Sequence, residues 1–355
     1  VSDQDMIHAS SGSFVKLYYN NSEKLATTNT GAVVTGILTA TTFSGNLTGN
    51  VTGDLTGNLA GISSIAAISS SISDTAVDIF VYDTRKDSDG GAWRKRTQHT
   101  SWYNETLGTA VRGTRREFPA VAVLVLETGY LKIYDGDDPD LPMWMVLNAT
   151  SSSLVRAPFA SSVAMLNAKL VVTDGNNYAG STIDFLLDDR DADRDLRQIG
   201  WSGNIADRND TSKQSTFGTT LLASQTANDV AMTVLPNAPI DDATGLPVPT
   251  IAVGTNTGVS VIKDDGSVYD INHTTSGYDV VSQIKIDEKY VYIGFGQASG
   301  YVGGIGYAVP IPRGDVSLGS IISATSESVF RWSLNSTSGS GGQSDYFINP
   351  SDSNA

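Results

Sequence analysis

Residues 43–61 repeat a four-residue unit in which an apolar side chain is followed by a small residue, Gly and then Asn or Asp. Four is an even multiple of the two-residue period of a strand, so the apolar side chains share one face of an extended chain. On a helix the unit would drift by about 40° per repeat, and each glycine would cost about 0.8–1 kcal/mol. The repeat therefore predicts β structure and excludes a helix. The apolar positions are Phe43, Leu47, Val51, Leu55 and Leu59.

One copy of this glycine-rich segment has too few side chains to bury its own apolar face. Such repeats become stable when copies stack or wind around one another. Glycine allows close approach of the backbones, and Asn or Asp tolerates a left-handed turn. We therefore expect residues 37–62 to form a thin β shaft built from several chains, with the five apolar positions as oligomerisation contacts. The alternative is a flexible Gly/Thr/Asn linker.

The composition narrows the class of protein. Charged residues make up 17% of the 355 residues and the formal net charge is −15. Few charges together with abundant Gly, Ser, Thr and Asn suit an all-β extracellular or virion-type protein. The negative charge argues against nucleic-acid binding and against adhesion to an anionic membrane. There is no cysteine, hence no disulfide, and no apolar run long enough for membrane insertion. Since the chain starts at Val1, we expect a fragment or a processed chain.

The first 36 residues carry signals of β-hairpins. Alternation predicts a strand over residues 13–20, and Asn20, Asn21 and Ser22 form a turn signal. Residues 23–28 can return as the second strand, and residues 33–38 form a third. We expect residues 1–36 to be a hairpin module.

The phrases over residues 15–31 and 34–46 resemble a module that recurs in structural proteins of marine tailed phages, including cyanophage fibres. The resemblance covers roughly residues 13–61. It implies a virion structural protein on the particle exterior, forming a homotrimer and contacting other virion proteins. Residues 78–147 also resemble a recurring segment of such proteins, which has no known activity.

After a connector over residues 63–75, which is either a short helix or a linker, an outline of apolar strands and Asp-rich turns recurs four times. Its spacing is near that of propeller blades with loop insertions. Residues 251–262 resemble the inner strand pair of many β-propellers. We expect an all-β chain with a propeller-like head over residues 76–335 and a low-complexity tail or linker over 336–355. A β-sandwich or a β-solenoid is the alternative. The copies cover residues 120–147, 163–187, 230–271 and 280–311, with partial copies at 77–83 and 329–334.

Two acidic clusters are candidates for a metal site. Loops rich in carboxylate oxygens suit Ca²⁺, although neither cluster has the EF-hand spacing. The alternative is a solvated turn in which Arg190 and Arg194 pair with their neighbours. The candidate ligands are Asp135, Asp137, Asp138, Asp189, Asp191 and Asp193.

A basic stretch with interleaved aromatic residues occupies residues 85–116. Aromatic rings stack on sugars, and Arg holds carboxylate or phosphate groups. The stretch predicts a surface patch for an acidic host glycan or lipopolysaccharide. The alternative is a long loop that pairs with acidic clusters. The candidate ligand-binding residues are Trp93, Arg94, Arg96, Trp102 and Tyr103.

Signatures of catalysis are sparse. His8, His99 and His273 are far apart and lack metal-ligand spacing. Walker, Rossmann and nucleophile-elbow patterns are missing from the sequence. We expect no enzyme and no cofactor other than the calcium considered above. The predicted function is host attachment by a tail fibre or similar appendage. The alternatives are a tailspike depolymerase using a carboxylate pair, or a purely structural baseplate, collar or capsid fibre.

Overall fold

A computed structural model describes residues 6–35, 75–190, 201–214, 222–273, 280–296, 305–318 and 330–333. Antiparallel strands dominate these residues, which confirms the expected all-β class. The chain divides into two compact units, Val1–Gly57 and Asn58–Ala355, and each is described by itself. In the part of the chain that the structure covers, none of the helices has the length and apolar character needed to cross a bilayer.

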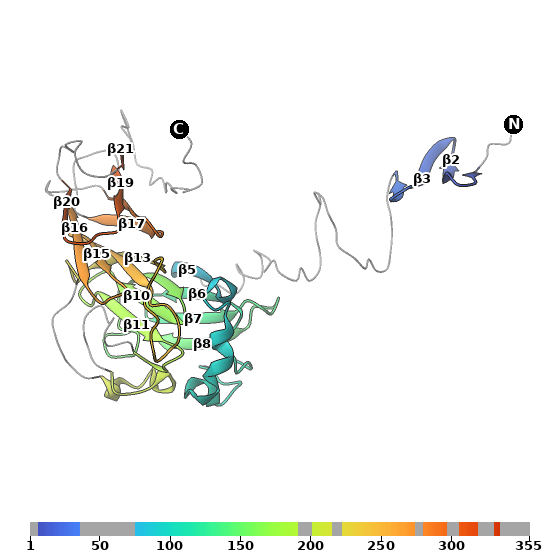
Figure 1. Ribbon diagram of the computed structural model, residues 1–355. Helices are drawn as coiled ribbons and strands as arrows, with labels where there is room; N and C mark the ends of the chain where they lie inside the picture. The colour runs from blue at the N-terminus through green and yellow to red at the C-terminus, as the bar shows by residue number, and fades with distance from the viewer. Residues whose placement is uncertain are drawn as a thin grey trace. The chain divides into compact units, whose positions relative to one another are not determined.

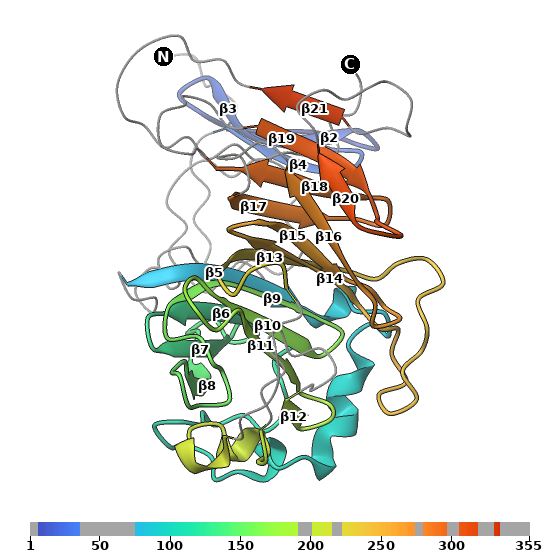
Figure 2. The same ribbon diagram turned by 90° about the vertical axis from the view of Figure 1, so that its left-hand side faces the viewer.

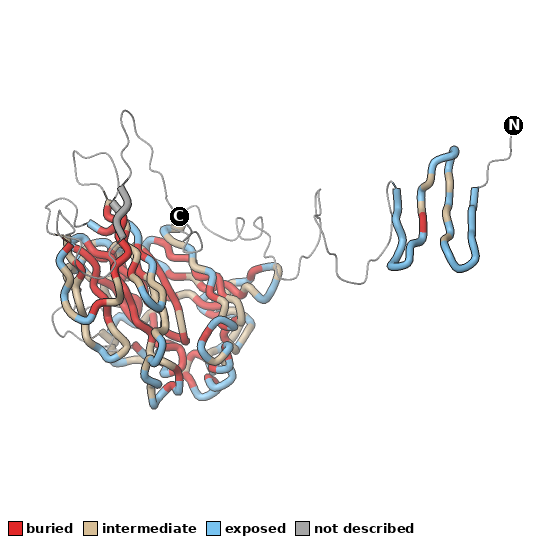
Figure 3. The backbone as a smooth tube through the Cα atoms, turned by 45° about the horizontal axis from the view of Figure 1, so that its top comes forward, coloured by how far each residue is buried: buried red, intermediate tan, exposed pale blue. Residues whose placement is uncertain are grey.

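The first unit contains a four-stranded antiparallel meander (Figure 1). Asn20 and Asn21 connect two of its strands with φ of 48° and 61°, a left-handed conformation that Asn tolerates. Most of its residues are exposed, shown in pale blue in Figure 3, and Ala26 is its buried apolar residue. The expected hairpins are confirmed, and a first strand is added to them. The strands are β1 (Ile7–Ser10), β2 (Phe14–Tyr19), β3 (Ser22–Thr28) and β4 (Gly31–Val34).

The second unit contains four sheets formed in sequence order. The first sheet consists of β5 (Ala76–Asp83), β6 (Val121–Glu127), β7 (Tyr130–Asp135) and β8 (Met143–Asn148). The second consists of β9 (Ala160–Leu166), β10 (Lys169–Asp174), β11 (Gly180–Asp184) and β12 (Asp189–Arg190). The third consists of β13 (Ala227–Thr233), β14 (Thr250–Thr255), β15 (Gly258–Ile262), β16 (Val268–His273) and β20 (Val316–Leu318). The fourth consists of β17 (Val281–Ile286), β18 (Tyr290–Phe295), β19 (Ile305–Pro310) and β21 (Phe330–Ser333).

Each sheet packs on the next one, and the first strands β5, β9, β13 and β17 contact one another in that order. Figure 2 shows the four sheets following one another from β8 to β21. Three apolar cores lie at the contacts between consecutive sheets. The strands that are buried on both faces are rich in Val, Ile and Leu, as is usual for such strands. Four sheets packed face to face in series fit the propeller-like arrangement that the strand outlines predict.

The two partial copies of the strand outline, at residues 77–83 and 329–334, correspond to β5 and β21, and each of these strands belongs to a sheet. β5 is the first strand of the first sheet and pairs with β6, although 37 residues of loop and 3-10 helix separate them in sequence. β21 pairs with β19 in the fourth sheet. The insertion between β5 and β6 contains the short helices η1 (Thr84–Lys86), η2 (Ala92–His99) and η3 (Trp102–Asn104).

Several sequence-based expectations fall outside the described residues. These are the shaft at residues 37–62 with its five apolar positions, the connector at 63–74, and the tail at 336–355. They remain predictions.

Candidate functional site

The first strand of every sheet in the second unit contains a β-bulge near its start. The register shifts by one residue before Asp78 in β5, before Asp229 in β13 and before Gln283 in β17. In β9 the extra residue lies just before Val163, at Ser161 or Ser162. A bulge re-aims a side chain away from the regular alternation of a strand. From these positions Asp78, Ser162 and Asp229 contact a neighbouring sheet, whereas Gln283 is exposed.

Asp78, Ser162 and Asp229 connect the four first strands through hydrogen bonds, and we call them the inter-sheet belt. Asp78 Oδ2 accepts from the backbone N–H of Val163 at 2.9 Å and lies 3.0 Å from Ser162 Oγ. Asp229 Oδ1 lies 2.9 Å from the same hydroxyl. Asp229 Oδ2 accepts from the backbone N–H of Ile284 at 2.7 Å. The belt therefore joins β5 to β9, β9 to β13, and β13 to β17.

The Ser162 hydroxyl lies between the two carboxyl groups of the belt. It carries a single hydrogen, so it can donate to only one of them at a time. Burial raises the pKa of Asp229, and the charge of Asp78 acts in the same direction, whereas hydrogen bonds from Ile284, Ser162 and Val230 act to lower it. The net effect is a raised pKa for Asp229.

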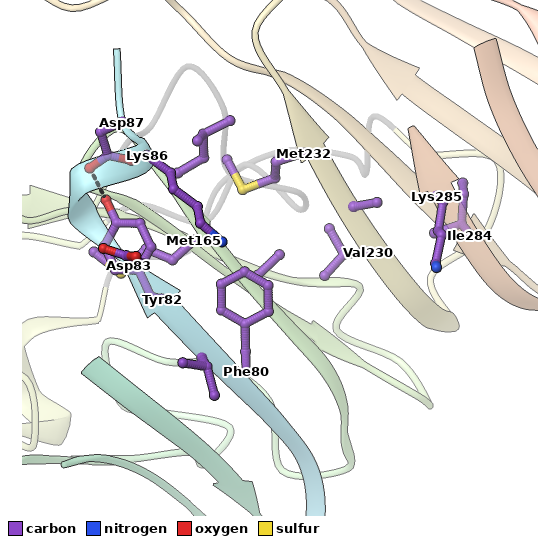
Figure 4. Close-up of a pocket in the computed structure, with 14 residues that line it drawn as sticks. Phe80, Tyr82, Asp83, Lys86, Asp87, Met165, Val230, Met232, Ile284 and Lys285 are labelled. Atoms are coloured by element: carbon purple, nitrogen blue, oxygen red, sulfur yellow. Dashed lines mark hydrogen bonds between the residues drawn. The ribbon is translucent and has the colours of Figure 1, made fainter. Parts of the chain in front are cut away.

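A hollow of about 410 Å³ lies where β5, β9, β13 and β17 converge, and we call it the central pocket. Figure 4 shows its lining side chains, which come from all four first strands and from η1. Most of them are apolar, including Phe80, Met165, Val230, Met232 and Ile284. An apolar hollow with a few polar groups at its edge is the usual form of a ligand site.

The charged groups at the edge of the central pocket are not equally available. Asp87 accepts from the hydroxyl of Tyr82, and also from Trp93 Nε1 at 2.8 Å and the backbone N–H of Asn167 at 3.0 Å. Asp83 forms a two-bond ion pair with an arginine. Lys86 is exposed and makes no hydrogen bond or ion pair with another described residue. The pocket therefore offers a cation to a ligand, whereas its carboxylates are engaged.

The prediction that Trp93 and Trp102 belong to a surface patch is wrong. Trp93 and Trp102 are 0% exposed and belong to the core between the insertion and the first two sheets. The ring of Trp93 packs on Phe118, with centroids 5.2 Å apart. The indole N–H of Trp102 donates to the carbonyl of Phe185 at 2.9 Å. Stacking on a sugar is excluded for both rings because protein atoms cover them.

The other members of the predicted patch also contact residues of the protein itself. Arg94 donates to the carbonyl of Phe118 at 3.2 Å, and Arg96 donates to the carbonyl of Thr244 at 2.6 Å. Tyr103 packs at the edge of the Trp102 ring, with centroids 5.9 Å apart. Arg115, in the same basic stretch, pairs with Asp135 and Asp137, as expected from the alternative in which the stretch is a long loop that pairs with acidic clusters.

The sequence analysis did not predict the structural role of two buried arginines, Arg112 and Arg208. Arg112 lies over the ring of Trp144 at 4.4 Å and forms an ion pair with Glu105 at 3.3 Å. Arg208 pairs with the same Glu105 at 2.6 Å. Burial lowers the pKa of Arg112 to about 10. A single carboxylate thus neutralises two buried guanidinium groups, whose remaining N–H groups mostly donate to backbone carbonyls.

The first acidic cluster is already paired inside the protein. Arg115 Nη1 lies 2.8 Å from Asp135 Oδ1 and 2.5 Å from Asp137 Oδ2. Burial acts to raise the pKa of Asp137, but the backbone N–H groups of Ala120 and Val121, together with Arg115, lower it overall. A calcium ion at this loop would therefore have to displace Arg115.

The structure brings together no calcium ligand set from the predicted residues. Asp138 accepts from a backbone N–H of its own turn at 3.0 Å. Asp189 is exposed in β12, whereas Asp191 and Asp193 lie outside the described residues. Over the described ranges, no three His, Asp or Glu side chains are grouped as metal ligands would be. Calcium binding stays a prediction for the second cluster.

The belt residues were missed because their signal is short. The bulge phrases share a small or apolar residue, then any residue, then a polar residue and a β-branched one. They stand near the start of the first strand in each sheet, at residues 76–79, 160–163, 227–230 and 281–284. Aligning the strand outlines on this phrase would have revealed the repeat.

Comparison with known proteins yields no family. No protein-family model and no curated protein matches the chain. One similar solved structure is PorZ, a bacterial surface component of the type-IX secretion system of Porphyromonas gingivalis. It has a TM-score of 0.29 and 11% identity over 53% of this chain and 19% of that chain. Another is Polycomb Repressive Complex 2 of Chaetomium thermophilum bound to GSK126, with a TM-score of 0.31 and 10% identity over 69% and 42% of the two chains. The chain thus spans less than half the length of either.

Proposed function

We propose that the protein is a fibre-like appendage of a tailed-phage virion whose second unit attaches to an anionic host-surface glycan without cleaving it. The resemblance of residues 13–61 and 78–147 to phage structural proteins supports the virion assignment. The small hairpin sheet of the first unit and the all-β second unit suit such an appendage. The observation that carries the attachment role is the central pocket, an apolar hollow at the convergence of four first strands with the exposed Lys86 at its edge.

The chemistry of the central pocket suits an acidic sugar. Apolar side chains such as Phe80 can cover the apolar face of a sugar ring. Lys86 supplies an ammonium group for a carboxylate or sulfate. This cation stands out in a chain with a net charge of −15. A weak site of this kind becomes an effective adhesin when several copies bind one surface.

The state of the carboxyl groups supports attachment rather than hydrolysis. A glycosidase needs two carboxyl groups that face the substrate. The two carboxyl groups that line the central pocket, those of Asp83 and Asp87, are already held by an ion pair or hydrogen bonds within the protein. Release of reducing sugar from host polysaccharide by the purified protein would overturn the non-enzymatic assignment in favour of a depolymerase.

The test is calorimetric titration of the full chain with an oligogalacturonate, a model acidic glycan, and with a neutral malto-oligosaccharide. We expect binding of the acidic probe only, weakened about tenfold by Lys86→Gln because a charge-assisted contact is worth about 1.5–3 kcal/mol. Lys95→Gln is the matched control, since Lys95 is an exposed lysine in η2 that does not line the pocket. Absence of binding of the acidic probe would contradict the proposal and leave a purely structural appendage. Equal binding by Lys86→Gln would contradict the assignment of the site to the central pocket.

A further inference from the structure

The outer face of the first sheet has the composition of an inter-sheet contact. The residue that follows the bulge packs against the preceding sheet at Val163, Val230 and Ile284, which are 2%, 6% and 5% exposed. The equivalent residue of β5 is Ile79, which is 45% exposed. Its neighbours on the same side, Val77 and Val81, are 46% and 57% exposed. We call Val77, Ile79 and Val81 the start face, and no described sheet covers it.

The outer face of the fourth sheet keeps two features of the same contact. In the third sheet Asp229 pairs with Gly254, and the absence of a side chain there admits Val281 of the fourth sheet. A Cβ on Gly254 would lie 2.5 Å from Val281 Cγ1. In the fourth sheet Gln283 is exposed at the bulge position and pairs with Gly294.

Gly294 therefore leaves a notch equivalent to that of Gly254, but an open one. A Cβ on Gly294 would meet only atoms of its own sheet, at 3.6 Å or more. We call Gln283 and Gly294 the end face. It is the position at which a further sheet would repeat the contact between the third and fourth sheets.

We propose that the start face of one copy of the protein packs against the end face of a second copy. The occupant is a second copy because the chain carries both halves of one repeating contact, and the copy contact continues the series of established ones. Ala76, which stands where Val281 stands in β17, would enter the notch at Gly294. Gln283 would take the place that Asp229 takes against Ile284. Such a head-to-tail contact closes into a ring or extends, depending on the rotation between copies.

The end face also carries a lysine, which bears on the strength of the proposed contact. Lys285 is exposed two residues after the bulge position, where β5, β9 and β13 carry Phe80, Ala164 and Ala231. A lysine at an open sheet surface opposes uncontrolled pairing while its aliphatic stem can still cover apolar surface. We therefore expect an association that depends on protein concentration.

The test uses the absence of cysteine from the chain. Full-length Ile79→Cys and Gln283→Cys are prepared as separate proteins of distinguishable mass, mixed, and treated with a short bis-maleimide cross-linker. We expect a covalent product containing one chain of each kind, and no product from either variant alone. A self-product of Ile79→Cys alone would show that two start faces meet each other and would overturn the proposal. Absence of the mixed product up to the solubility limit would overturn it as well.

Two controls separate this contact from other association. Replacing Gln283→Cys by Lys95→Cys in the mixture should abolish the product, because η2 belongs to neither face. Adding Gly294→Leu to the Gln283→Cys chain fills the notch and should lower the yield at least tenfold, while the melting temperature stays within a few degrees because the notch is open. Oligosaccharide binding is measured on the same samples, so failure of this contact is distinguishable from failure of the proposed attachment role.

Discussion

Asp78 and Asp229 belong to strands of different sheets, yet both lie within 3.0 Å of one hydroxyl, that of Ser162 on the strand between them. The three side chains link sheets whose apolar faces would otherwise be free to slide past one another. The belt thus adds directional bonds to contacts that hydrophobic burial alone leaves without direction.

The raised pKa of Asp229 makes stability depend on pH. A carboxyl whose pKa is raised on folding, as burial raises that of Asp229, binds its proton more tightly in the folded state. Its contribution is therefore fully present at low pH and is lost as pH rises from the ordinary Asp value through the raised value. We expect Asp229→Asn to flatten the fall in melting temperature across this window. Thermal melts at closely spaced pH values test this.

Asp265 provides a control for that experiment, because its pKa is shifted in the opposite direction, downward. Hydrogen bonds from Ser267 lower the pKa of Asp265, an exposed turn residue. Its contribution is present above the ordinary Asp pKa and is lost as pH falls through the lowered value. Asp265→Asn should change only the acid side of the curve. If Asp229→Asn and Asp265→Asn change the same side, the raised pKa of Asp229 is not the source of the loss of stability at higher pH.

Trp102→Ala should destabilise the second unit by about 3–5 kcal/mol, because it empties a large site in a closed core. Its indole also donates to a backbone carbonyl, which would lose its partner. Chemical denaturation followed by far-UV circular dichroism measures the change. Lys95→Gln, in the same insertion, should stay within about 0.5 kcal/mol of the unmodified protein. A neutral Trp102→Ala would restore the surface-patch interpretation.

Glu105→Gln should cost about 3–5 kcal/mol, because Arg112 and Arg208 would remain buried without a counter-charge. The control is Glu117→Gln, which removes a wider ion pair, 3.6 Å from Arg94, at a more exposed site. We expect less than about 1 kcal/mol there. Urea unfolding of both variants at pH 7 separates them, and similar costs would show that Glu105 is not the required counter-charge.

Gly254→Ala should destabilise the contact between the third and fourth sheets by about 1–3 kcal/mol, because the added methyl group overlaps Val281. Val281→Ala in the same chain should recover most of that loss, which a double-mutant cycle would measure as coupling. Gly294→Ala is the matched control and should be nearly neutral. Additive effects of Gly254→Ala and Val281→Ala would show that the two residues do not meet.

Most strands could be predicted from the sequence, because alternation and turn signals depend only on residues that are close to one another in the chain. The hairpin turn at Asn20 and Asn21 and the outline of the four sheets were readable in this way. The insertion was not, since a tryptophan among arginines has the same local pattern on a surface as in a core. Trp102 is buried by Phe185 and Trp144, which lie far along the chain, and no local signal carries that information.

The sequence by itself determined that this chain is all-β, because its residue types and two-residue periods suit pleated strands whatever surrounds them. Only the tertiary structure decided which polar residues matter. Ser162 meets Asp78 and Asp229 across 84 and 67 residues of sequence. Lys86 reaches a pocket built from four separate strands. Contacts of this kind arise when sheets stack, and stacking depends on the whole set of apolar faces rather than on any one stretch.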